Sequence, residues 1–150
     1  MSFNTEKFER AKFKDRTEDV PVADISPDIA KFFDLKKGEK PVWTVRALTG
    51  EQLAIANRAV SENKAIEAVI EAATSRMKKE KVEGIKELAG IATEKVPDDL
   101  VKRYSILEQG SVDPVCNHEL AMKLAREYAT VFNLLTNKII ILTGAGRLGE

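Results

Sequence analysis

Apolar positions recur at helical spacing through most of the chain after residue 49. The first apolar face consists of Ile66, Val69, Ile70, Ala73 and Met77. Their spacing places them on one side of an α-helix. A second face resumes in a new phase at Val82, Ile85, Leu88 and Ala92. We therefore expect long helices, with a kink or break near residues 80–84.

Capping signals predict where these helices begin and end. Residues 49–52 read Thr-Gly-Glu-Gln, the T-x-x-Q form of a capping box, which predicts a helix start at Thr49. A further helix is expected from residues 97–99 (Pro-Asp-Asp) to about Gln109, with Gly110 as its C-terminal stop.

The last helix is predicted to be long and strongly apolar on one side. Asp113-Pro114 precedes it, and we expect one continuous rod over residues 117–142, about 39 Å long. Its stripe contains Leu124, Tyr128, Val131, Phe132, Leu135 and Ile139. Three preceding helices need not cover the whole stripe, and uncovered apolar surface is typical of an interface. The alternative is full burial of the stripe within a helical bundle. The sequence therefore indicates these six residues as partner-binding, with self-association as a second use of the same surface.

The first third of the chain has a different character. Residues 17–23 alternate polar and apolar side chains, and residues 41–48 are rich in branched and aromatic ones. The two segments predict the strands of a hairpin, with Trp43 buried in it. Between them, Ser26-Pro27 predicts a helix start, and the helix should run to about Leu35. Before them, Phe3, Phe8 and Phe13 recur every five residues, which fits neither helix nor strand. These rings fit either a core or an arm that folds on a partner.

The patterns together predict a mainly α fold, a small helical bundle with a short N-terminal β-hairpin. We expect a single domain over residues 1–150. Its parts are an N-terminal arm (1–25), a short helix and strand (26–48), a helical region (49–143) and a flexible Gly-rich tail (144–150).

Composition and charge narrow the classes of function. The chain has 24 basic and 24 acidic residues among 150, and this balance argues against a dedicated nucleic-acid binder. The basic run at residues 76–81 lacks interleaved aromatics and is typical of a solvated helix end. No apolar run approaches the roughly 20 residues that a membrane span needs. We expect a soluble, cytoplasmic protein without a signal peptide.

Residue types that carry chemistry are sparse. One cysteine, Cys116, and one histidine, His118, exclude a thiolate zinc site and any site with two imidazoles. Residues 144–149 match the G-x-G-x-x-G dinucleotide fingerprint after an apolar run, but no helix or acidic residue follows in the context that this motif requires. We therefore expect no catalytic residue, no cofactor and no metal ion.

One segment resembles a known family. Residues 42–54 read VWTVRALTGEQLA and resemble a W-x-V-R-x-L-T-G-E-x-L-A stretch of tail assembly chaperones from long-tailed (siphovirus-type) bacteriophages. The flanks are similar too, from Phe13 and Arg16 upstream to the Leu142-Thr143-Gly144 ending.

The resemblance implies a non-enzymatic role in the host bacterial cytoplasm. Proteins of this family bind the helical tape-measure protein during tail morphogenesis, keep its apolar stretches in solution, help recruit tail-tube subunits and are absent from the mature virion. In many of these phages a ribosomal frameshift near the end of the gene gives a longer form. Two alternatives stay open: a structural tail or head–tail component that is retained in the virion, and a nucleotide-binding enzyme that uses the C-terminal glycines.

Overall fold

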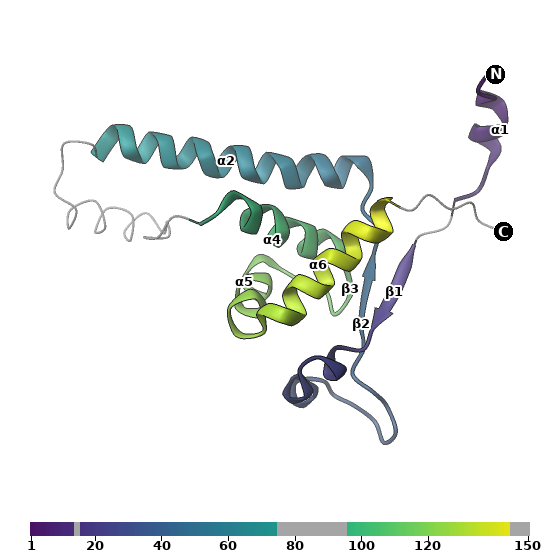
Figure 1. Cartoon of the computed structure of the whole chain (residues 1–150), viewed down its shortest axis with the longest axis vertical. Helices are drawn as coiled ribbons and strands as arrows, with labels where there is room; N and C mark the ends of the chain where they lie inside the picture. The colour runs from purple at the N-terminus through teal and green to yellow at the C-terminus, as the bar shows by residue number, and fades with distance from the viewer. Residues whose placement is uncertain (14–15, 75–95, 145–150) are drawn as a thin grey trace.

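The computed structural model describes residues 1–13, 16–74 and 96–144 (Figure 1). The expected break near residues 80–84, the second apolar face, the basic run at 76–81 and most of the Gly-rich tail lie outside these ranges. Within them the fold is mainly α with a short antiparallel sheet, as expected.

The sheet has three strands in the order β1-β2-β3. β1 (Thr17–Val20) pairs with β2 (Trp43–Arg46), with Val20 opposite Trp43, so the predicted pairing is confirmed. β3 (Ser111–Asp113) pairs with the other edge of β2. It lies in the connection between two predicted helices, where no strand was expected, so the prediction of a hairpin alone was wrong. The buried Trp43 side chain spans this second pairing, because its indole N–H donates to Ser111 Oγ at 2.9 Å.

Two 3₁₀ helices connect β1 to β2. They are η1 (Val22–Asp24) and η2 (Pro27–Phe32). The predicted short helix begins at Pro27 as expected, but it is a 3₁₀ helix that ends at Phe32 rather than near Leu35, and the Ser26 side chain makes no capping hydrogen bond. Ile29 is buried in the core, whereas Phe32 is exposed. Six residues with one buried side chain do not supply the packing that an α-helix of this length needs.

α2 (Gly50–Thr74) and α4 (Asp98–Gly110) form an antiparallel pair. The predicted capping box starts α2: Gln52 N donates to Thr49 Oγ1 at 3.2 Å, and Thr49 N donates to Gln52 Oε1 at 2.9 Å. Gln109 Nε2 donates to the Gln52 carbonyl at 3.0 Å at one end of the pair, and Lys64 is ion-paired with Asp98 at 3.3 Å towards the other. α4 ends at Gly110, as predicted.

The expected continuous rod over residues 117–142 is two helices. α5 (His118–Glu127) and α6 (Ala129–Gly144) meet at Tyr128, whose φ of −133° and ψ of 60° interrupt the helical backbone. The break lets α5 contact α4 while α6 lies against α4 and β2 (Figure 1). Two separate directions bury more of the apolar stripe than one straight rod could.

Polar contacts fix the end of α6 against the sheet. The Arg16 guanidinium donates to the carbonyls of Leu142 and Thr143 in the last turn of α6, and side-chain donors commonly satisfy carbonyls at such a position. A cation at a helix C-terminus is also favoured by the helix dipole. Thr143 Oγ1 accepts from Leu48 N at 2.9 Å, and Lys138 is ion-paired with Glu18 at 3.3 Å. The C-terminal helix is thus joined to residues that precede β1 and α2.

α4 and α6 approach each other closely at Gly110. A Cβ on Gly110 would lie 2.5 Å from Ile139 Cδ1, closer than side chains come in proteins. Ile139 is fully buried at this point. The glycine that stops α4 therefore also makes room for the centre of the core.

Candidate partner-binding site

The apolar stripe that was predicted to bind a partner forms the centre of the core. Leu124, Val131, Phe132, Leu135 and Ile139 are all buried, the last four almost completely. Tyr128 is half-buried. A partner cannot reach the five buried side chains in the folded chain. A binding surface has to be built from other residues.

The two helices on either side of Tyr128 bury the stripe against different neighbours. α5 buries Leu124 against α4, and α6 turns Phe132 towards the ring of Tyr104, with centroids 5.7 Å apart. Tyr128 itself makes an edge contact with the exposed ring of Phe32 at 6.4 Å. The apolar stripe is thus covered by other elements of the same chain.

An exposed aromatic cluster lies at the N-terminus, in and around α1 (Thr5–Arg10). Phe3, Phe8 and Phe13 are 73%, 53% and 54% exposed. Their rings contact one another, with centroids 5.4 Å apart for Phe3 and Phe8 and 5.2 Å apart for Phe8 and Phe13. We call these three residues the aromatic arm. α1 buries no residue, so the arm keeps its rings outside the core.

Local contacts explain how so short a helix forms in the arm. Asn4 Oδ1 accepts from Lys7 N at 2.9 Å and caps the start of α1. Glu6 and Arg10 form an i,i+4 ion pair at 2.6 Å. The helix also explains the spacing of five, because it brings together rings that lie before it, in it and after it. Figure 1 shows α1 projecting away from the helices and the sheet.

A second exposed apolar surface runs along α2. Ile55, Ile66 and Val69 are 41%, 48% and 67% exposed. The sequence pattern predicted a core-facing helical face at Ile66, Val69 and Ile70, yet only Ile70 of these three is half-buried. α4 is shorter than α2 and covers another side of it. Periodicity in the sequence could not predict this exposure, because it identifies an apolar face of a helix but not whether another element packs against that face.

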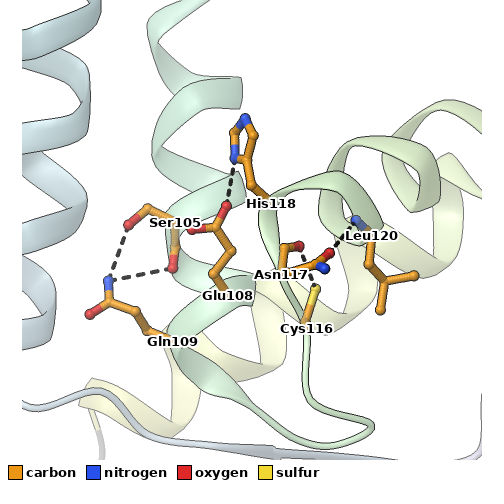
Figure 2. Close-up of polar contacts among 7 residues, drawn as sticks. All are labelled: Ser105, Glu108, Gln109, Cys116, Asn117, His118 and Leu120. Atoms are coloured by element: carbon orange, nitrogen blue, oxygen red, sulfur yellow. Dashed lines mark hydrogen bonds and ion pairs between the residues drawn. The ribbon is translucent and has the colours of Figure 1, made fainter.

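The polar residues between α4 and α5 have structural roles (Figure 2). His118 Nδ1 contacts Glu108 Oε1 at 2.6 Å, and its ring stands edge-on to Tyr104. Asn117 Oδ1 accepts from Leu120 N at 2.8 Å and caps α5. Gln109 Nε2 donates to Ser105 Oγ at 3.1 Å. The Asn117 contact starts α5, the His118 contacts tie it to α4, and the Gln109 contact lies within α4.

Cys116 is buried at this junction and does not have the properties of a nucleophile. Its thiol donates to the Asn117 carbonyl at 3.4 Å. Burial, with a smaller contribution from the charge of Glu108, raises the pKa of the Cys116 thiol to about 11. The thiol is therefore protonated near neutral pH, whereas the reactive form of cysteine is the thiolate.

The described ranges contain neither a metal-binding group nor a membrane-spanning helix. No group of three or more His, Cys, Asp or Glu residues in the part of the chain that the structure describes could hold a metal ion. No helix there is long and apolar enough to cross a membrane. The candidate site is therefore the aromatic arm, with the exposed face of α2 as a second surface.

In comparisons with known proteins, no family model, no curated protein and no solved structure matches the chain.

Proposed function

We propose that this chain is a tail assembly chaperone of a long-tailed bacteriophage. In this proposal it binds the tape-measure protein without catalysis, helps recruit tail-tube subunits in the host cytoplasm, and is absent from the mature virion. The observation that carries the proposal is the segment Val42–Ala54, which resembles the family stretch from its Trp to its Leu-Ala end.

The position of this segment in the fold indicates a structural role and not a role in binding the partner. Trp43, Val45 and Leu48 are buried, and Thr49 with Gln52 caps α2. These residues form a strand, a turn and the start of a helix, and little of their side-chain surface is accessible to a partner. Contact with a partner then falls to residues outside the segment.

The aromatic arm has the surface that such a partner requires. A tape-measure protein is helical and carries apolar stretches, and such stretches bind to exposed apolar side chains. Phe3, Phe8 and Phe13 offer three rings at one end of the molecule. Burying one such side chain is worth about 1.5–3 kcal/mol. Charged residues between the rings, such as Lys7 and Glu9, keep the free arm hydrated.

Co-expression tests the proposed function. The tape-measure protein of the same phage should accumulate in the soluble fraction with this chain and precipitate without it. The two proteins should also co-purify. Failure to raise the soluble yield and to co-purify would contradict the proposal.

The virion distinguishes a chaperone from a structural component. Mass spectrometry of purified phage particles should detect the tape-measure and tail-tube proteins but not this chain. Stoichiometric presence in particles would favour a retained tail or head–tail component instead.

A third test addresses the nucleotide-binding alternative. Titration with NAD or ATP should give no binding, and deletion of residues 144–150 should leave chaperone activity unchanged. Saturable binding that the deletion abolishes would favour the nucleotide-dependent function.

A further inference from the structure

The exposed side of α2 carries a regular stripe that the proposed function does not use. Five exposed residues succeed one another at intervals of three, four, three and four: Ile55, Arg58, Glu62, Ala65 and Val69. This is the a/d spacing of a coiled-coil seam. Ala54 and Ile66 flank the seam and are exposed as well. We call these seven residues the α2 seam.

The α2 seam faces away from α4. Ala56, buried at the α4 contact, and Asn63, whose Nδ2 donates to the Val96 carbonyl at 3.5 Å, lie on another side of α2. At 100° per residue, this side is more than a quarter of a turn from the middle of the seam. Figure 1 shows α2 along the margin of the molecule, with α4 beside it. The seam is therefore accessible to a second molecule.

The two charges in the seam indicate what that molecule is. Arg58 and Glu62 are exposed, and neither side chain forms an ion pair or a side-chain hydrogen bond with another described residue. An apolar helix laid on the seam would leave both charges unpaired. A second α2 in parallel would place Arg58 against Arg58 and Glu62 against Glu62.

An antiparallel second copy pairs six of the seven seam residues with one another and places Val69 opposite the exposed Glu51. With a twofold axis at the level of residue 60, Arg58 lies opposite Glu62 of the other copy. The same symmetry places Ile55 opposite Ala65 and Ile66 opposite Ala54, so that each large side chain meets a small one. Every contact occurs twice, as a twofold interface requires. In antiparallel coiled coils an a position faces a d position, and the pairing of 58 with 62 and of 55 with 65 follows that rule.

We propose that two copies of this chain associate through the α2 seam in this antiparallel register. The contact follows about 27 Å of helix, from residue 51 to residue 69. An interface of this length lies at the small end of specific interfaces, so we expect a dissociation constant on the order of 10 µM. The inference is independent of the tape-measure proposal, because it concerns the free chain alone.

Reciprocal charge exchange tests the register in the full chain. Sedimentation equilibrium of the wild type at about 5 to 200 µM should show a monomer–dimer equilibrium. Arg58→Glu and Glu62→Arg should each weaken the dimer about tenfold or more, since each puts two like-charge contacts in the interface. An equimolar mixture of the two variants should recover wild-type affinity, because the mixed dimer restores both pairs. The double variant Arg58→Glu/Glu62→Arg should dimerise as the wild type does.

Controls separate the interface from effects within one helix. Glu71→Arg changes an exposed charge of α2 outside the seam and should leave the dimer unchanged. Circular dichroism should show equal helix content in all variants. A wild type that is monomeric up to 200 µM would overturn the proposal. So would a dimer that both single variants leave intact, or a mixture that does not recover.

Discussion

Two apolar regions of this molecule, both flagged by the sequence as possible binding surfaces, have opposite positions in the fold. The C-terminal stripe centred on Phe132 is buried against α4 and the sheet, whereas the aromatic arm centred on Phe8 is exposed. Phe132 in α6 contacts the ring of Tyr104 in α4. In the described residues, the ring contacts of Phe3, Phe8 and Phe13 are all with one another. The density of apolar residues therefore did not indicate the binding surface. An apolar region is buried in this fold where another helix or strand packs against it, and it is exposed where none does.

The largest expected difference between the two regions is in stability. Phe132→Ala should lower the free energy of unfolding by about 3–5 kcal/mol, because it leaves a cavity in the core. Phe8→Ala removes the same side chain from the exposed arm and should change it by less than about 0.5 kcal/mol. Urea denaturation followed by circular dichroism measures both. Equal losses for the two variants would show that the arm is part of the core.

A smaller effect is expected where α4 meets the stripe. Gly110→Ala would bring a methyl group against Ile139 and should cost about 1–3 kcal/mol by overpacking. Gly50→Ala is the matched control, because nothing lies within 4 Å of a Cβ at that position. It should be neutral or stabilising by up to about 1 kcal/mol.

A double-mutant cycle sharpens this test of the stripe. In an Ile139→Ala background, which removes the three nearest side-chain atoms, Gly110→Ala should cost less than it does in the wild type. The same cost in both backgrounds would place the strain elsewhere.

The smallest effect on stability is expected at the start of α2, which is packed on one side and exposed on the other. Thr49→Ala removes one half of the capping box and should cost about 1 kcal/mol. Ser61→Ala, in the same helix, removes an exposed hydroxyl with one weak contact to the Asn57 carbonyl at 3.5 Å and should be close to neutral. Thermal unfolding of both variants measures the difference. A Thr49→Ala variant as stable as Ser61→Ala would mean that the cap is not needed.

Local signals predicted the parts of the fold that depend on neighbouring residues. The capping box at Thr49 and Gln52, the stop at Gly110 and the pairing of β1 with β2 are all present. The break at Tyr128 was not predicted, because no glycine or proline marks it and the apolar stripe continues across it. β3 was not predicted either, because three residues are too short to show a period. Both features are set by tertiary contacts.

The candidate site shows the same limit. The stripe was predicted as a surface because its partners, α4 and β2, are not visible in its own sequence. The aromatic arm was noticed because its spacing fits no regular element, but only the structure brings its three rings together. The α2 seam became recognisable once α4 was seen to cover a different side of the helix.

Calorimetric titration of the full chain with an apolar helical fragment of the tape-measure protein tests the central claim, that the arm rather than the stripe binds the partner. Phe3→Ser/Phe8→Ser should weaken binding about ten- to a hundredfold with unchanged stability. Phe32→Ser/Val115→Ser, which removes two exposed apolar side chains elsewhere, should change the affinity less than about threefold. Wild-type affinity in the arm variant, with the fold intact, would contradict the account.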